Sequence, residues 1–403
     1  MIIEPKILNN ICITAHPLGC AKEVENQINY IKSKPKIKSD VKNALILGAS
    51  GGYGLASRIA AGYGLGAKTM SVSFEKAATE RRTATPGWYN NEAFSSFAKK
   101  DGIEDKNLIL DAFLNSSKEE VIKEAKSFFN GEKIDLIIYS LAAPSRTDES
   151  TGTVYRSSLK PIGKKYKGIG VDFITEELLE VSIDTANEDD IKSTVKVMGG
   201  EDWKLWTEAL LNADMLSENA LNIAYSYIGP EMTKAIYRKG TIGKAKDHLE
   251  KTAHELNKEM QEKIKGHAYV SVNKAVVTRS SAVIPTVPLY IGILFKVMKN
   301  KGLHENCIEQ MYRLISEKLY SGKEIPVDSE NRIRLDDWEL RDDVQKEVSD
   351  AWNKLNKDNL KELADLELFR KDYMNMHGFE EDGIDYGQDV QIQRLILNNL
   401  INA

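Results

Sequence analysis

Tyrosines and lysines are concentrated between residues 222 and 246, where three tyrosines and four lysines fall within one stretch. A tyrosine beside a lysine can donate a proton to an oxygen that gains negative charge, because a nearby ammonium lowers a phenol pKa that begins near ~10. Tyr225 and Lys234 have eight residues between them, and so do Tyr237 and Lys246. Lysine is common here, so spacing alone favours a core tyrosine with solvated lysines.

Helix geometry restricts the second of these pairs. Positions nine apart lie on opposite faces of a continuous helix with 3.6 residues per turn, so Tyr237 and Lys246 cannot meet on one. Gly240 and Gly243 lie between them and predict a helix stop and restart, which would let the two side chains converge. Tyr237 with Lys244, six residues between them, is a further alternative.

Three glycines, Gly48, Gly52 and Gly54, follow an apolar strand-like segment at Ala44–Leu47 and precede a small-residue helix at Leu55–Ala61. Such a loop permits unusual dihedral angles and close approach of the backbone to a ligand. The amides at the helix start and the positive end of the helix dipole favour an anion. The strand and helix on either side make a dinucleotide pyrophosphate the predicted ligand.

The residue that contacts the adenosine ribose is expected at the end of the next strand, where Phe74 and Glu75 stand. A carboxylate accepts hydrogen bonds from both ribose hydroxyls and repels a 2′-phosphate, so Glu75 favours NADH over NADPH. Lys76, Arg81 and Arg82 can offset part of that repulsion. Together with a tyrosine and lysine pair, a bound dinucleotide would indicate nicotinamide chemistry.

Asp111-Ala112 and Leu141-Ala142 end the third and fourth strand-like segments, at the edge where open α/β sheets bind ligands. Asp111 could reach the adenine amino group, and capping of the next helix is the competing role. The P-loop pattern G-x-x-x-x-G-K-[ST] is absent from the sequence.

Apolar segments that alternate with helical stretches predict a Rossmann-like, doubly wound parallel sheet with helices on both faces, which is the α/β class. The first four predicted strands are Ala44–Leu47, Thr69–Phe74, Asn107–Ala112 and Asp135–Leu141. Later predicted strands are Val195–Met198, Leu221–Tyr225 and Ala268–Val277, with a long helix at Lys244–Lys265.

The chain contains no proline-rich or serine-rich linker and no internal repeat, which predicts one elaborated domain over residues 1–403. Its first part, 1–80, holds a short N-terminal hairpin and the glycine loop. The part 81–320 holds the rest of the sheet and the catalytic region, including a buried helix and its approach at 283–295. The part 325–403 is predicted to be an accessory helical segment.

Charge and cysteine content exclude several classes of protein. The 55 basic and 60 acidic residues give a net charge of −5, with no basic stretch interleaved with aromatics, so nucleic acid is not an expected partner. Three cysteines without C-x-x-C spacing indicate neither disulfides nor a zinc cluster and are typical of the cytoplasm. The opening Met-Ile-Ile-Glu-Pro-Lys lacks the features of a signal peptide.

Neither a membrane span nor a metal centre is expected. The most apolar run, Val283–Phe295, is too short to span a bilayer and contains Pro285 and Pro288. The six histidines form no H-E-x-x-H or similar ligand pair, so surface or packing roles are expected for them.

The chain resembles the trans-2-enoyl-CoA reductase family, which includes the FabV type of enoyl-acyl-carrier-protein reductase and is related to the short-chain dehydrogenases. The resemblance covers essentially the whole chain. It is carried by Pro5, Thr14-Ala-His-Pro-Leu-Gly-Cys20, the loop 48–54, Gly87-Trp-Tyr-Asn90, Val197-Met-Gly-Gly-Glu-Asp-Trp203, the stretch 236–246, Lys274-Ala-Val-Val-Thr278 and the segment 284–299.

The resemblance implies NADH-dependent reduction of a trans-2-enoyl thioester, with short-chain crotonyl-CoA as the expected substrate. It assigns the family's Y-x8-K pair to Tyr237 and Lys246 as catalytic residues, and substrate contact to Tyr227. It implies that NAD contacts Gly48, Ala49, Ser50, Gly51, Gly52, Tyr53, Phe74, Glu75, Asp111, Ala112, Leu141, Ala142, Lys246, Val276, Val277 and Thr278. An enoyl-acyl-carrier-protein reductase is the first alternative and a non-catalytic NAD-binding regulator the second; a monomer is expected.

Overall fold

The computed structural model describes residues 1–8, 11–284 and 286–393, and a parallel sheet forms its centre. The strands are β3 (Asn43–Leu47), β4 (Lys68–Ser73), β5 (Asp105–Ile109), β6 (Ile134–Tyr139), β11 (Leu216–Ser226), β12 (His267–Val272) and β13 (Arg332–Arg334). They pair in the order β5-β4-β3-β6-β11-β12-β13, and every neighbouring pair is parallel. The winding direction reverses between β3 and β6, which confirms the predicted doubly wound α/β fold.

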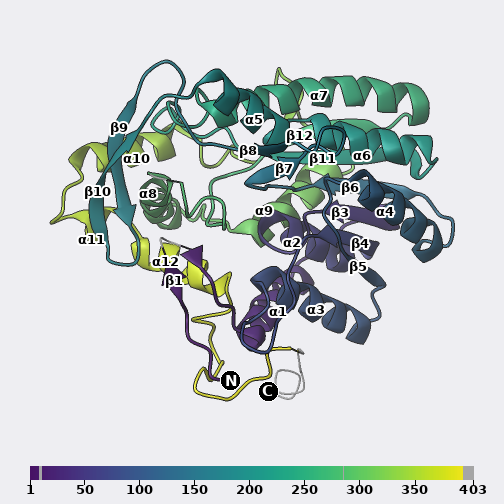
Figure 1. The fold of residues 1–403 in the computed structure, drawn as a ribbon, viewed down its shortest axis with the longest axis horizontal. Helices are drawn as coiled ribbons and strands as arrows, with labels where there is room; N and C mark the ends of the chain where they lie inside the picture. Colours follow the sequence, from purple (N-terminus) through teal and green to yellow (C-terminus); the bar gives the residue numbers. More distant parts are fainter. Residues whose placement is uncertain (9–10, 285, 394–403) are drawn as a thin grey trace.

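Helices cover both faces of this sheet (Figure 1). On one face lie α1 (Pro17–Lys32), α2 (Gly52–Ile59), α3 (Pro86–Lys100) and α9 (Cys307–Arg313). On the other lie α4 (Asn115–Phe128), α6 (Glu201–Asn212) and α7 (Thr241–Ile264). Along β3, Ala44 and Ile46 join the first core while Leu45 and Leu47 join the second. Successive strand residues point to opposite faces, so a strand buried on both sides reads as a continuous apolar run.

Most of the strand predictions are confirmed, but four strands end earlier than expected, and β4 does so by one residue, at Ser73. β5 stops at Ile109 and β6 at Tyr139, so Asp111 and Leu141 lie in the connections that follow the strands. β12 ends at Val272, five residues before the predicted Val277. The segments just beyond these strand ends are where an open parallel sheet binds ligands.

The predicted strand Val195–Met198 is wrong, because this segment is the last turn of α5 (Glu188–Met198). The side chain of Asn187 accepts from the backbone N–H of Asp190, and the Asp190 side chain accepts from the Asn187 N–H. This capping box starts a helix upstream of the β-branched residues. Thr194 and Val197, three positions apart, are then buried on one helix face.

A second group of elements lies beside the sheet, on the left of Figure 1. It contains the hairpin β9 (Tyr166–Asp172) and β10 (Glu177–Ile183), and the helices α8 (Val287–Asn300), α10 (Asp342–Lys354), α11 (Leu360–Leu363) and α12 (Leu366–Asn375). Their apolar side chains form a separate core around α8, which is the predicted buried helix. The hairpin β9–β10 and the smaller hairpin β7 (Ser145–Thr147) and β8 (Val154–Arg156) are insertions that the sequence did not predict.

The predicted N-terminal hairpin is present as β1 (Ile7–Leu8) and β2 (Ile11–Cys12), which pair antiparallel. The accessory segment is helical in α10 to α12, as predicted, and it also contributes the edge strand β13 to the sheet. Within the described part of the chain, no helix is long and apolar enough to cross a membrane.

Candidate active site

The glycine loop packs too closely for side chains at two of its positions. Gly48 has a φ of 85°, and a Cβ there would lie 2.4 Å from the Ser140 carbonyl oxygen. A Cβ on Gly54 would lie 1.9 Å from the Gly48 carbonyl oxygen, so this glycine lets α2 close onto the loop. Gly51, in contrast, has no atom within 4 Å of its Cβ position, which leaves the outside of the loop open at the start of α2. Open amides at a helix N-terminus are suited to a phosphate.

Glu75 is held against this loop. The Ser50 hydroxyl donates to Glu75 Oε1 at 2.7 Å, and the Asn90 side-chain amide donates to the Ser50 carbonyl at 2.9 Å. A Cβ on Gly87 would lie 2.3 Å from Glu75 Oε1, so a side chain there would displace the carboxylate from this position. Phe74 beside it is 70% exposed. The Gly87 to Asn90 motif therefore supports the loop, a role that its sequence alone did not reveal.

Asp111 and Ala112 are fixed by different contacts just beyond β5. The carboxylate of Asp111 accepts the Phe113 backbone N–H at 3.0 Å, which is a local turn contact. Asp111 does not cap the next helix, because the N-cap of α4 is Leu114 and no side chain caps it. The carbonyl of Ala112 accepts from Trp206 Nε1 and from Lys118 Nζ, each at 3.0 Å. These two long side chains hold the backbone at this edge of the sheet in one position.

Thr278 is the predicted nicotinamide-side residue that the structure brings to the glycine loop. Its Cγ2 lies 3.7 Å from the Cβ position of Gly52, and the preceding Val276 and Val277 are buried. Leu141 lies on the other side, with Cδ2 3.1 Å from the Cβ position of Gly48. Segments that follow β3, β6 and β12 thus converge on one loop.

Tyr53 and Ala142 complete the predicted cofactor set. The Tyr53 hydroxyl donates to the Lys274 carbonyl at 2.5 Å, which ties α2 to the segment after β12. Ala142 is exposed in the segment after β6. The open loop at Gly51 could bind the pyrophosphate of a dinucleotide, and the carboxylate of Glu75 could bind a ribose that carries a 2′-hydroxyl and no 2′-phosphate.

Tyr237 lies in a turn outside the helix that carries Lys246, as Gly240 and Gly243 predicted. The turn ends at Gly240, the N-cap of α7. A Cβ on Gly240 would lie 2.8 Å from the Lys160 carbonyl oxygen, and one on Gly243 would lie 1.9 Å from that of Arg238. Both glycines therefore allow the turn to fold back over the first turn of α7.

Tyr237 and Lys246 both meet the carboxyl end of β11. The Tyr237 ring packs edge-on against Tyr227 with 5.0 Å between ring centres, and Lys246 Nζ donates to the Tyr225 carbonyl at 3.3 Å. Burial raises the pKa of Tyr237 to about 12, which keeps its phenol protonated. Burial lowers the pKa of Lys246 to about 8.

The alternative tyrosine and lysine pairs do not converge. The Tyr225 hydroxyl lies 2.6 Å from Ser57 Oγ under α2. Lys234 pairs with Glu231 at 2.6 Å and is 37% exposed, while the 57% exposed Lys244 lies 3.6 Å from the carboxylate of a neighbour on α7, Asp247. The residues of these pairs therefore point to different surroundings, in line with the assignment that the resemblance implied.

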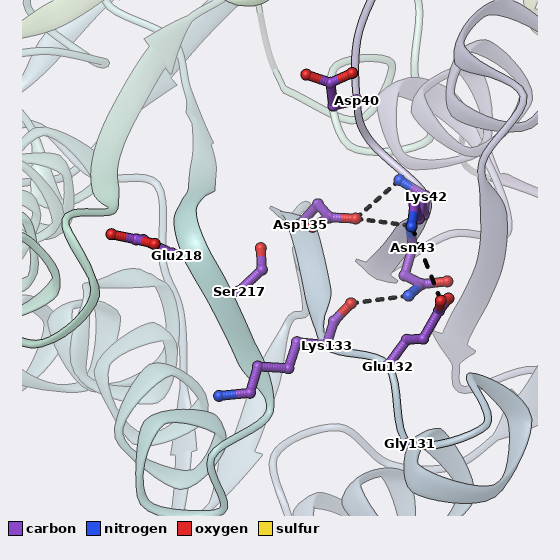
Figure 2. Close-up of a pocket in the computed structure, with 9 residues that line it drawn as sticks. All are labelled: Asp40, Lys42, Asn43, Gly131, Glu132, Lys133, Asp135, Ser217 and Glu218. Atoms are coloured by element: carbon purple, nitrogen blue, oxygen red, sulfur yellow. Dashed lines mark hydrogen bonds and ion pairs between the residues drawn. The ribbon is translucent and has the colours of Figure 1, made fainter.

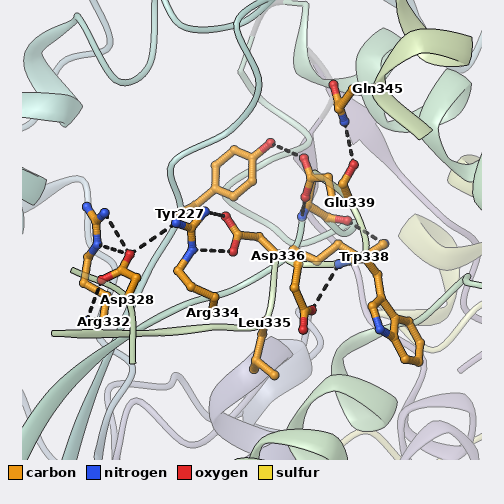
Figure 3. Close-up of polar contacts among 12 residues, drawn as sticks. Tyr227, Asp328, Arg332, Arg334, Leu335, Asp336, Trp338, Glu339 and Gln345 are labelled. Atoms are coloured by element: carbon orange, nitrogen blue, oxygen red, sulfur yellow. Dashed lines mark hydrogen bonds and ion pairs between the residues drawn. The ribbon is translucent and has the colours of Figure 1, made fainter. Parts of the chain in front are cut away.

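The Tyr227 hydroxyl donates to Glu339 Oε1 at 2.9 Å (Figure 3). Glu339 follows β13, more than one hundred residues further along the chain, and is 0% exposed. No sequence motif singled it out, because its role depends on where β13 joins the sheet.

A pocket lies at the opposite edge of the sheet, where β3, β6 and β11 begin (Figure 2). Asp135 accepts the backbone N–H groups of Lys42 and Asn43 at 2.8 and 3.0 Å, and Asn43 Nδ2 donates to the Lys133 carbonyl at 2.8 Å. These bonds align the starts of β3 and β6. Ligands of open α/β sheets bind at the carboxyl edge, so we interpret this pocket as structural.

In the described residues, no three His, Cys, Asp or Glu side chains are placed to hold a metal ion. Two histidines have visible structural roles. His16 Nδ1 accepts from Gly19 N at the start of α1, and His248 Nδ1 accepts from Gly200 N at the start of α6.

Three family models match the chain. Residues 2–80 match the NAD(P)H binding domain of trans-2-enoyl-CoA reductase, residues 82–320 match the trans-2-enoyl-CoA reductase catalytic region, and residues 327–390 match the enoyl reductase FAD binding domain.

The residues of the third match do not fit a flavin dinucleotide. Gly378 has a φ of 75°, and its Cβ position lies 2.3 Å from the carbonyl oxygen of His16, so this glycine packs against the N-cap of α1 and is not open to a ligand. The segment instead packs on α8 and supplies Glu339. The glycine loop at 48–54 lies in the match to the NAD(P)H binding domain instead.

Three relatives are similar over nearly their whole length. A trans-2-enoyl-CoA reductase [NADH] of Brachyspira hyodysenteriae is 88% identical, with 97% of this chain and 100% of the relative covered. An enoyl-[acyl-carrier-protein] reductase [NADH] of Flavobacterium johnsoniae is 52% identical over 96% and 97%. The crystal structure of a Clostridium acetobutylicum trans-2-enoyl-CoA reductase in complex with NADH has a TM-score of 0.96 at 48% identity, covering 98% and 100%.

Proposed function

The chain belongs to the trans-2-enoyl-CoA reductase family, and from that premise we propose how its site performs the reaction. It is an NADH-dependent oxidoreductase that saturates the trans-2 double bond of an enoyl thioester. This activity sets aside the non-catalytic regulator. The observation that carries the proposed mechanism is that Tyr237 packs against Tyr227, just after β11, while Lys246 donates to the Tyr225 carbonyl near the end of β11.

The cofactor would lie along the carboxyl edge of the sheet, with its pyrophosphate at the open amides around Gly51. Glu75, oriented by Ser50, would accept the ribose hydroxyls and disfavour a 2′-phosphate. Val276 to Thr278 would face the nicotinamide, because Thr278 lies beside Gly52. When bound, NADH supplies the hydride that reaches the β-carbon of the substrate.

Tyr237 would donate its O–H to the thioester oxygen as that oxygen gains the charge of an enolate. A preorganised donor aimed at a developing oxyanion in a buried site lowers the barrier strongly. Burial keeps the phenol protonated, with a pKa of about 12, so it acts as a donor. Lys246 would orient the cofactor and keep the local potential positive while its ammonium is protonated. Protonation of the α-carbon completes the reduction.

We propose a short-chain enoyl-CoA, crotonyl-CoA in particular, as the preferred substrate. The 88% identical relative is named for an enoyl-CoA, and this supports coenzyme A as the carrier. The 52% identical relative is named for an acyl carrier protein, which keeps that thioester as the second candidate.

The substrate is tested by measuring kcat/KM for crotonyl-CoA, dodecenoyl-CoA and a carrier-linked crotonyl group, with NADH oxidation followed by absorbance. A clear preference for crotonyl-CoA supports the proposal. A higher kcat/KM with the carrier-linked substrate would make the chain an enzyme of fatty acid synthesis instead.

We further propose a monomeric, cytoplasmic enzyme without a nucleic-acid partner. The net charge of −5 disfavours binding to phosphate backbones. Cys12, Cys20 and Cys307 are all free thiols, and burial raises the pKa of each, which suits a reducing compartment. Light scattering during gel filtration would test the monomer; a mass near twice 45.2 kDa would contradict it.

A further inference from the structure

Glu339 is a buried carboxyl group that contacts three separate elements around the site. It accepts the Tyr227 O–H at 2.9 Å and the Tyr290 O–H at 2.6 Å on Oε1, and the Ala275 backbone N–H at 2.6 Å on Oε2. Tyr227 follows β11, Tyr290 lies in α8 and Ala275 follows β12. One carboxylate thus links the segment after β11, the segment after β12 and helix α8.

The backbone around Glu339 is itself held firmly. The backbone N–H groups of Leu335 and Asp336 donate to the Val272 carbonyl at the end of β12, at 2.9 and 3.1 Å. Gln345 Nε2 donates to the Glu339 carbonyl at 2.7 Å (Figure 3). The side chain of Glu339 is therefore directed from a fixed point on the sheet toward the site.

The ion pairs of the same segment add to this anchorage. Arg334 pairs with Asp336 at 2.6 Å, and Asp328 bridges Arg332 and Arg334. Figure 3 shows this chain of contacts running alongside the Tyr227 to Glu339 bond. Positions of catalytic groups are best held when the groups that orient them are themselves fixed.

Three hydrogen bonds stabilise the buried carboxylate of Glu339, and one of them fixes the hydroxyl of Tyr227. An ionised carboxylate only accepts, and here two phenols and one amide donate to it. Burial raises the pKa of Glu339, while the hydrogen bonds from Tyr290 and Ala275 and the nearby Lys274 lower it. A phenol has a single O–H, so the O–H of Tyr227 is committed to Glu339. Tyr237 is then left as the tyrosine that can donate to a thioester oxygen.

We propose that Glu339 is a positioning residue for the reduction, which holds Tyr227 edge-on against Tyr237 and fixes Ala275 next to the nicotinamide segment. The inference rests on the proposed function. Glu339 would act through Tyr227 by holding the Tyr227 ring at a fixed distance from the phenol of Tyr237. A small displacement of reacting groups can cost on the order of 10²-fold in rate, which sets the size of the effect to expect.

A double-mutant cycle tests this role. Glu339→Gln keeps the shape of the side chain but replaces one acceptor oxygen by an N–H donor group. We expect it to lower kcat/KM for crotonyl-CoA by about 10- to 100-fold. In the Tyr227→Phe background the same substitution should cost much less, because the contact through which it acts is already lost. Losses that simply multiply would overturn the proposal.

Glu305→Gln is the matched control, because Glu305 is also buried but pairs with Arg313 at 2.7 Å. Its effect should be the same with and without Tyr227→Phe. If Glu339→Gln does not fold, Glu339→Asp keeps the charge and retracts it from Tyr227, and the same coupling is expected. Wild-type enzyme without activity on crotonyl-CoA would count against the proposed function, whereas an active wild type with uncoupled variants would count against Glu339 alone.

Discussion

The cofactor side and the substrate side of the site are built in different ways. The glycine loop, Glu75 and the Gly87 motif lie within about fifty residues of one another, and strand, loop and helix follow in order. The proposed substrate side gathers Tyr227, Tyr237 and Glu339 from the segment after β11, a turn and the segment after β13. The first region is therefore defined by local sequence, and the second by long-range packing.

This difference indicates what each region can tolerate. On the cofactor side, backbone geometry leaves no room for side chains, as at Gly48 and Gly54. On the proposed substrate side, the polar atoms to which we assign the chemistry are held by their neighbours. Backbone changes should therefore affect NADH binding, and polar changes should affect turnover.

The largest effect should come from Tyr237→Phe. Loss of one oxyanion donor costs about 10²- to 10³-fold in kcat, so turnover of crotonyl-CoA should fall by that factor. NADH binding, followed by fluorescence titration, should stay close to wild type because the cofactor side is untouched. Tyr225→Phe is the matched control, since its phenol contacts Ser57 instead, and it should keep nearly normal kcat. Normal turnover by Tyr237→Phe would place the donor elsewhere.

Gly48→Ala should break the cofactor side next. Its Cβ would collide with the Ser140 carbonyl at 2.4 Å in a backbone conformation with φ of 85°. Strain of about 1–3 kcal/mol would weaken NADH binding by roughly 5- to 150-fold if NADH binds only the wild-type conformation of the loop. Gly66→Ala is the control. Gly66 also has a positive φ, 75°, but no atom lies within 4 Å of its Cβ position, so the substitution strains the backbone without a collision. Equal NADH affinity in both variants would show that the collision is unimportant.

Glu75→Gln should change cofactor choice with less effect on rate. Removing the negative charge relieves repulsion of a 2′-phosphate, so the ratio of kcat/KM for NADPH to that for NADH should rise by about tenfold, or ~1.4 kcal/mol. The Ser50 hydroxyl can still donate to the amide oxygen, so the loop should stay in place. Steady-state kinetics with both cofactors measures the ratio. An unchanged ratio would exclude Glu75 as the discriminating group.

The smallest effect is expected from pH. Lys246 has a pKa lowered to about 8 by burial, so its ammonium is lost as pH rises through 8, and kcat/KM should fall about twofold at that pH. The stability of the enzyme without NADH should change with pH in the opposite direction to kcat/KM. Between pH 8 and the ordinary value of 10.5 the unfolded chain binds more protons, so rising pH favours the folded enzyme.

Comparison with Lys246→Met isolates both trends. The bend in the kcat/KM profile near pH 8 should disappear in this variant, although its activity is low. Its unfolding free energy, measured with urea from pH 8 to 10.5, should rise less with pH than that of wild type. Lys244→Met, which removes an exposed lysine paired with Asp247, should leave both trends unchanged.

The cofactor side could be predicted from the sequence to a greater extent than the substrate side. The glycine loop, Glu75 and the first strands are local patterns, and the structure has them where periodicity placed them. The strand prediction for Val195–Met198 is wrong because the capping box over 187–190 starts a helix there, and this outweighs the β-branched composition. Glu339 was missed because no spacing links it to Tyr227, and only the pairing of β13 with β12 brings them together. The choice between tyrosine and lysine pairs likewise needed resemblance, since Gly240 and Gly243 showed only that convergence was possible.

The central claim is that this site delivers hydride to the β-carbon and a proton to the α-carbon of an enoyl-CoA. The most direct test incubates the enzyme with crotonyl-CoA and NADH that carries deuterium at the transferable C4 position, in ordinary water. The product should be butyryl-CoA with one deuterium on C3 and none on C2, as read by NMR and mass spectrometry. Deuterium on C2, or NADH oxidation without saturated product, would contradict the account.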